Sequence, residues 1–126
     1  MIRFAALTTC FALTAATSAI AGDHSAAAVQ TSDAGYLTDA HGMTLYSFDK
    51  DADGQSNCYG GCAQKWPPLV VEAGTDLPEG ASLVSRTDGS QQVAFDGKPL
   101  YLWVNDTAPG QTSGDGVGGA WHIVKP

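Results

Sequence analysis

The sequence predicts a small all-β domain built from two tandem copies of one unit, arranged as a pseudo-symmetric sheet, sandwich or barrel. The main observation is an ungapped match between HGMTLYSFDKD (41–51) and DGKPLYLWVND (96–106), at an offset of 55 residues (96 minus 41). In both segments the side-chain types alternate with the two-residue period of a strand. Turn signals that contain glycine separate such segments, and no stretch keeps a helical period.

Aromatic and acidic residues recur at matched positions in the two copies. Each copy contains the pattern Tyr-x-aromatic-x-x-Asp, and a tryptophan follows at the same distance. Matched aromatic positions favour core packing, although an exposed row of rings could instead stack on sugars or on a partner surface. Neither copy alone has enough apolar residues for a stable core, so we expect the copies to fold together. The repeated residues are Tyr46, Phe48, Asp51, Trp66, Tyr101, Trp103, Asp106 and Trp121.

Turn signals divide the chain into expected strands. Three x-Gly pairs, at residues 41–42, 88–89 and 96–97, each lie between β-like runs and favour tight turns. The strand of the second copy is apolar on both faces, which predicts a covered central strand. A single helical turn is expected near Cys62–Trp66. The expected strands cover residues 35–39, 43–48, 68–72, 82–86, 91–95, 99–104 and 120–124.

The first 21 residues have the features of a secretory signal peptide. One basic residue, Arg3, precedes an apolar run that ends in the small-x-small pattern Ala19-Ile20-Ala21. This run is too short and too rich in threonine to span a membrane, and LTTC, which ends at Cys10, is a poor lipidation site. We expect cleavage near Ala21 and a soluble periplasmic or secreted product.

The rest of the chain suits one domain. Residues 22–34 are small and polar with a single valine, and are expected to form a flexible lead-in. Residues 35–126 form the predicted β domain, with its two copies at about 36–72 and 91–126 joined by a connecting segment.

Acidic residues outnumber basic ones, which limits the classes of partner. The formal net charge is −7 at neutral pH. Nucleic acids and anionic membrane surfaces select basic proteins, so neither is an expected partner. Beyond the signal peptide, no apolar run is long enough for a membrane span. Cationic partners and metal ions remain compatible with this charge, and so does a role in solubility alone.

Two cysteines, Cys58 and Cys62, remain after signal cleavage. In an exported chain they most simply form one disulfide, which would stabilise a short loop by about 2 kcal/mol. Their C-x-x-x-C spacing is one residue longer than that of thioredoxin-type redox pairs, and the sequence shows no adjacent base. A structural disulfide is therefore favoured, and a redox pair is the alternative.

The segment before these cysteines resembles the start of a calcium-binding loop. Asp49, Asp51 and Asp53 fill the first three ligand positions of DxDxDG, and the carbonyl of Gln55 would be the fourth ligand. The glutamate that normally closes such a loop is replaced by Gly60. Only the equivalent of Asp51 recurs in the second copy, which favours a turn capped by this carboxylate over a calcium site.

Other chemistry has less support in the sequence. His41 and Met43, with His122, are ligand types that suit copper, but two ligands on one turn do not close a site. The sequence contains no G-x-S-x-G, no H-E-x-x-H and no pairing of a histidine with a free thiol. We therefore expect a protein that is not an enzyme and that needs no cofactor, with calcium as the open alternative.

The segments YSFDKD (46–51), YLWVND (101–106) and NCYGGCAQKWPPL (57–69) resemble the bacterial secreted repeat of unknown function. That family is often labelled a predicted lipoprotein with a conserved Yx(FWY)xxD motif. The resemblance extends from about Tyr36 to Val124 and implies an exported tandem repeat with no established activity. The signal of this chain lacks a good lipidation site, which departs from the lipoprotein label of the family but not from its repeat.

These observations favour an exported, non-enzymatic binding or interaction module of the cell envelope. Its partner would be an envelope protein or a small ligand, and its working surface would be the loops 49–66 and 106–120. The alternative is a periplasmic redox or metal-handling protein that uses the two cysteines, calcium or copper. The sequence sets neither the oligomeric state nor the pathway.

Overall fold

The structure is a computed structural model that describes residues 27–126. The predicted signal peptide and the first part of the predicted lead-in lie outside these residues. Short strands dominate the described part of the chain, which confirms the prediction of a small, mostly β fold. The strands are β1 (Gln30–Thr31), β2 (Leu37–Thr38), β3 (Tyr46–Phe48), β4 (Val70–Val71), β5 (Ala81–Ser85), β6 (Gln91–Phe95), β7 (Lys98–Pro99) and β8 (Trp121–Ile123), and the helical segments are α1 (Gly61–Lys65) and the 3-10 segment η1 (Val117–Gly119).

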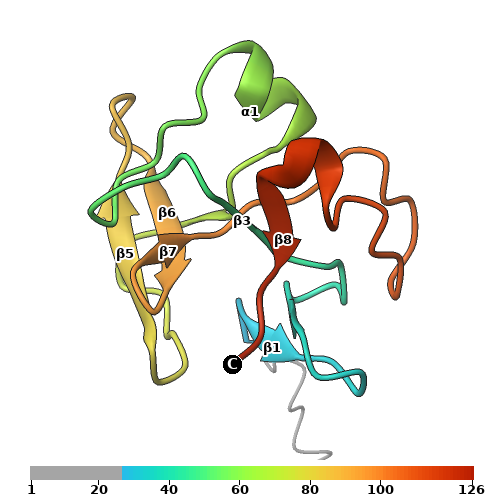
Figure 1. Cartoon of the computed structure of the whole chain (residues 1–126). Coiled ribbons are helices and arrows are strands. Elements are labelled where there is room, and N and C mark those ends of the chain that lie inside the picture. The colour runs from blue at the N-terminus through green and yellow to red at the C-terminus, as the bar shows by residue number, and fades with distance from the viewer. Residues whose placement is uncertain (1–26) are drawn as a thin grey trace, which may run out of the picture.

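The strands form three small antiparallel sheets and do not close a barrel. β1 pairs with β2, β3 pairs with β8, and β6 lies between β4 and β5 with β7 added to it. Figure 1 shows β5, β6 and β7 on one side of the molecule, β3 and β8 near its centre, and α1 and β1 at opposite ends. Two equivalent turns need glycine because Gly42 and Gly97 have φ angles of 82° and 77°.

Each half of the fold combines strands from both copies. β3 of the first copy pairs with β8 of the second, so that Phe48 lies opposite Trp121. In the other half, the amide of Leu102 donates to the carbonyl of Pro67. β8 of the second copy thus pairs with the motif strand of the first, and the residues just before β4 bond to the motif segment of the second copy, so the two copies interlock.

The two halves meet at an antiparallel bridge between the motif tyrosines. The amide of Tyr46 donates to the carbonyl of Tyr101, and the amide of Tyr101 donates to the carbonyl of Tyr46, both at 2.9 Å. The two hydrogen bonds join equivalent atoms of the two copies in opposite directions. A pseudo-two-fold axis between the copies relates contacts in this way. The predicted pseudo-symmetry is present in the fold.

Two clusters of buried residues form the core. One is aliphatic and contains matched residues such as Leu45 and Leu100, both without exposed surface. The other is aromatic and lies between the two copies. Its buried members are Tyr46, Cys58, Trp66, Tyr101 and Trp121.

The observed strands differ from the predicted ones in two places. The expected strand 99–104 is not continuous, because β7 ends at Pro99 and Tyr101 forms only isolated bridges. In addition, β1 lies within the described part of the expected lead-in, where no strand was predicted. Val29 is 3% exposed and packs in the aliphatic cluster, while β1 pairs with β2. One apolar side chain and two strand residues are enough to attach this segment to the core.

Candidate functional site

The tyrosine and the aspartate of the repeated motif bind each other across the copies. The hydroxyl of Tyr46 donates to Asp106 Oδ2 at 2.5 Å, and the hydroxyl of Tyr101 donates to Asp51 Oδ2 at 2.6 Å. Hydrogen bonds to a carboxylate are stronger than neutral ones, and both tyrosines are fully buried. The motif of each copy is therefore completed by the other copy.

The second oxygen of each motif aspartate organises the loop that follows it. Asp51 Oδ1 accepts the amide of Asn57 at 2.7 Å, and Asp106 Oδ1 accepts the amide of Ser113 at 3.1 Å. Burial raises the pKa of the Asp51 carboxyl, while the bonds from Tyr101 and Asn57 act in the opposite direction. The recurring acid thus caps its loop and also binds the opposite copy.

Four aromatic rings form a continuous column through the interface of the copies. In order they are Phe48, Trp121, Trp66 and Trp103, with centroid separations of 4.2, 3.8 and 3.9 Å. The central pair, Trp66 and Trp121, is nearly parallel at 2° and only 3% and 6% exposed. The two central rings lie in the core and the two end rings are partly buried against it, so the alternative of an exposed aromatic row does not fit the structure.

Each central tryptophan also contacts a motif tyrosine edge to face. The centroids of Tyr46 and Trp66 lie 5.4 Å apart, and those of Tyr101 and Trp121 lie 5.1 Å apart. These separations are in the range in which aromatic pairs attract beyond their buried area. The column and the tyrosine bonds therefore form one interlocked unit.

Burial, followed by the bond to aspartate, raises the pKa of Tyr46 and of Tyr101 above the ordinary value of 10.0. When the pKa of a group is higher in the folded than in the unfolded state, its contribution to stability is fully present below the unfolded-state pKa. That contribution is lost as the pH rises from the unfolded-state pKa toward the folded-state pKa. We therefore expect the free energy of unfolding to fall above pH 10, by up to about 1.4 kcal/mol per pH unit for each tyrosine. Denaturant unfolding across alkaline pH would measure this slope.

The control for the alkaline measurement is Tyr46→Phe, which removes one of the two ionisable groups. Its unfolding free energy should depend less steeply on alkaline pH than that of the unsubstituted protein. An unchanged slope in this variant would show that Tyr46 is not one of the groups responsible.

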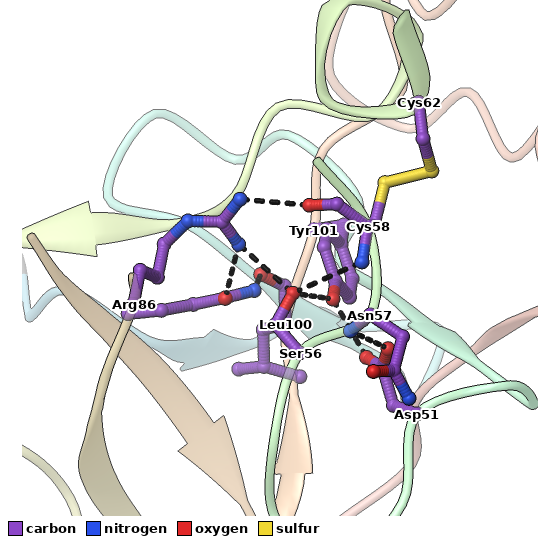
Figure 2. Close-up of a disulfide and its surroundings, with 9 residues drawn as sticks. Asp51, Ser56, Asn57, Cys58, Cys62, Arg86, Leu100 and Tyr101 are labelled. Atoms are coloured by element: carbon purple, nitrogen blue, oxygen red, sulfur yellow. Dashed lines mark hydrogen bonds between the residues drawn. A yellow bond between two sulfur atoms is a disulfide. The ribbon is translucent and has the colours of Figure 1, made fainter. Parts of the chain in front are cut away.

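The predicted disulfide is present, and it lies beside a buried arginine. Cys58 and Cys62 are bonded, and Cys58 has no exposed surface. The guanidinium of Arg86, which is 6% exposed, donates to Ser56 Oγ at 2.9 Å, to Gln92 Oε1 at 2.8 Å and to the carbonyl of Cys58 at 2.7 Å. Figure 2 shows the guanidinium directed at Ser56 and at the carbonyl of Cys58, where the disulfide loop begins. Arg86 thus fixes this loop to the β5–β6 hairpin.

The arginine cluster also connects to the repeated motif. Ser56 Oγ lies 2.5 Å from the hydroxyl of Tyr101, which donates in turn to Asp51. On the other side, the ring of Tyr59 covers the guanidinium at 4.3 Å from its centroid. Arg86 was not among the predicted site residues. The available signal was that the chain has no other arginine besides Arg3, and that Arg86 immediately precedes a turn.

The aspartates of the predicted calcium loop line a common hollow of about 200 Å³, together with Lys98. Asp49 lies 2.8 Å from His122 Nε2, and both oxygens of Asp51 accept hydrogen bonds. Asp53 takes the left-handed conformation, with φ of 56°. Within residues 27–126, no three acidic, histidine or cysteine side chains are grouped as a metal would require. Calcium binding therefore stays a prediction, without a preformed ligand cluster behind it.

Three other predicted ligands, Gln55, His41 and Met43, lie in tight turns that their backbone amides help to close. The amide of Gln55 donates to the carbonyl of Ala52 at 2.9 Å and closes a tight turn. His41 and Met43 lie in the turn after β2, where both of their amides bind Asp39 Oδ1. His122 instead lies on β8, opposite Ser47. The residues that were considered as copper ligands therefore lie on separate structural elements, the turn after β2 and the strand β8.

The two loops that were expected to form a working surface lie at the same end of the molecule. Figure 1 shows α1 beside the loop that precedes β8. These loops contact each other through Gly114, where a Cβ atom would lie 2.8 Å from Trp66 and 2.9 Å from Tyr46. The contact leaves no room for a side chain, so this part of the loop end joins the two copies.

A larger cleft lies between three segments of the chain. They are residues 27–28 before β1, the turn 39–41, and residues 69–76, which include β4. Its volume is about 740 Å³. The aliphatic wall consists of Leu69, Val70 and Val71, and Val70 is 46% exposed. The polar residues that line it include Asp39, His41, Thr75 and Asp76.

The fold and these contacts define a two-copy β domain whose repeated motif joins the copies to each other. A family model described as a secreted repeat of unknown function matches residues 27–70 and 82–125. The chain belongs to this family, as its motifs predict. No curated protein and no solved structure matches the chain.

The matched ranges place the start of each copy earlier in the chain than predicted. Each copy begins before the predicted starts at about 36 and 91, and the first copy includes the segment that contains β1. The family description is consistent with export of this chain. Among the residues that the structure describes, no helix is both long and apolar enough to cross a bilayer.

Proposed function

We propose that this chain is an exported, non-enzymatic binding module of the cell envelope, and that the cleft beside β4 is its binding site. The observation that supports this is the cleft itself. Its volume of about 740 Å³ lies within the range of about 300–1,000 Å³ that is usual for ligand sites. It also combines an aliphatic wall with a few polar side chains, which is the usual composition of such sites.

The distribution of contacts supports the cleft over the loop end. The motif tyrosines and the central tryptophans are buried between the copies, where they hold the fold together. The wall of the cleft, in contrast, keeps an apolar side chain in contact with solvent at Val70. Exposed apolar surface in a hollow gains free energy when a ligand covers it.

The test compares the two large apolar residues that are exposed in residues 27–126. Val70 lies in the cleft and is 46% exposed, while Val104 lies outside it and is 49% exposed. We expect the neutral dye Nile red to bind the unsubstituted protein with enhanced fluorescence. Val70→Asp should weaken this binding by about tenfold or more, because a carboxylate in the apolar wall loses hydration when the dye binds.

Val104→Asp is the matched control and should leave dye binding unchanged. Unfolding midpoints of both variants would show that each is folded. Equal binding by the unsubstituted protein and Val70→Asp, or equal losses in the two variants, would overturn the cleft as the binding site.

A further inference from the structure

We propose that the cleft selects ligands that carry an ammonium group on an apolar body, and that Asp39 binds this group. This inference rests on the proposed function, because it assigns a chemical class to the ligand of the same cleft. It concerns one carboxylate oxygen for which residues 27–126 supply no hydrogen-bond donor.

Asp39 is buried, and only one of its two carboxylate oxygens accepts hydrogen bonds from residues 27–126. The residue is 7% exposed, and its Oδ1 accepts the amides of His41 and Met43, both at 2.9 Å. These two bonds fix the carboxylate in the turn after β2. No donor within residues 27–126 forms a hydrogen bond with Oδ2. A carboxylate oxygen that has no donor from the protein, on a residue that is otherwise largely buried, favours a charged donor over a neutral one.

The free oxygen retains access to solvent at the cleft. Within residues 27–126, every side-chain oxygen that is fully enclosed has a hydrogen-bond partner, so Oδ2 of Asp39 is not fully enclosed. Asp39 is also one of the residues that line the cleft. A ligand in the cleft can therefore supply the missing donor.

The other residues of the cleft favour the same class of ligand. Asp76 adds a second carboxylate, and His41 is the one basic side chain among the lining residues, which include neither lysine nor arginine. The hydroxyl of Thr75 donates to the carbonyl of Glu72 at 2.7 Å and is thus already engaged. The whole chain has a net charge of −7, which attracts cations at long range and repels anions.

The aliphatic wall favours an apolar group in the part of the ligand that does not bind Asp39. Leu69, Val70 and Val71 would cover an apolar body, while the ammonium group binds Asp39. A hydrogen bond from a charged donor contributes about 1.5–3 kcal/mol, which corresponds to about 10–150-fold in affinity. An ammonium ligand should therefore bind more tightly than a neutral one of the same shape.

Three probes with closely similar phenylalkyl bodies and different polar groups test this inference. They are phenylbutylamine, phenylbutanol and phenylbutyrate, titrated into the processed chain and followed by amide-resolved NMR. We expect phenylbutylamine to shift the amide signals of the cleft and to bind at least about tenfold more tightly than phenylbutanol. Phenylbutyrate should bind most weakly.

Asp39→Asn assigns the preference to this residue. Asparagine keeps an Oδ1 acceptor for the turn but replaces Oδ2 by an amide group, so the preference for phenylbutylamine should disappear. Its binding of phenylbutanol should remain, which would show that the cleft is intact. Asp88→Asn is the matched control, because Asp88 accepts the amide of Ser90 in a turn outside the cleft.

The outcomes separate this inference from the proposed function. Equal affinities for the amine and the alcohol, or tighter binding of phenylbutyrate, would overturn the ammonium preference and leave the cleft as a binding site. A preference that survives in Asp39→Asn would overturn the role of Asp39. The absence of any shift in the cleft with all three probes would overturn the proposed function itself.

Discussion

Trp66→Ala is expected to lower the free energy of unfolding by about 3–5 kcal/mol, the range for removing a buried aromatic side chain. Trp66 stacks on Trp121 and on Trp103 and meets the edge of Tyr46, so its loss opens a cavity between the copies. Denaturant unfolding followed by circular dichroism would measure this loss. A single transition should be retained, because residues from both copies line the cavity.

Trp103→Ala is the control for this substitution. Trp103 lies at the end of the column, is only partly buried, and stacks on one ring. Its removal should cost about 1.5 kcal/mol, in line with partial burial of an aromatic side chain. Equal losses for the two variants would contradict the central role of Trp66.

Arg86→Leu is expected to destabilise the protein by about 3 kcal/mol, because buried acceptors lose a charged donor. The substitution leaves Gln92 Oε1 and the carbonyl of Cys58 without the donor that satisfies them. Leucine has a similar apolar bulk, so the effect comes mainly from the unpaired oxygens. Unfolding in denaturant with the disulfide kept oxidised would measure it.

Two further variants make the arginine measurement specific. Arg86→Lys keeps the charge but cannot reproduce the planar set of donors, so it should be intermediate in stability. Lys98→Leu removes an exposed cation and should change the unfolding free energy by less than about 0.5 kcal/mol. If Arg86→Lys were as stable as the unsubstituted protein, the geometry of the guanidinium would not matter.

The residues of the repeat could be predicted from the sequence, but their partners could not. Tyr46 and Tyr101 stand at the same position in the pattern, which correctly indicated two copies that fold together. A repeated pattern gives the register within a strand but does not say which copy supplies the neighbouring strand. The bonds from Tyr46 to Asp106 and from Tyr101 to Asp51 therefore became visible only in the fold.

Residues that occur once were the hardest to assign. The disulfide followed from the export signal and two close cysteines, whereas Arg86 has no counterpart and no motif. Asp39 was not among the predicted site residues, because the sequence does not show that residues 27–28 and 69–76 form a cleft with it. The run of aspartates had a familiar spacing, but Asp51 is used by the repeat.

The exchange of strands between the copies has a consequence for cleavage of the backbone. The connection between β4 and β5 is largely exposed around Gly74, and the contacts that join the copies lie elsewhere. A protease that nicks this connection would leave two fragments held by the β3–β8 ladder, the bridge between Tyr46 and Tyr101, and the ring column. The molecule would then be a non-covalent heterodimer of complementary peptides, so a native size and shape would no longer show that the backbone is intact.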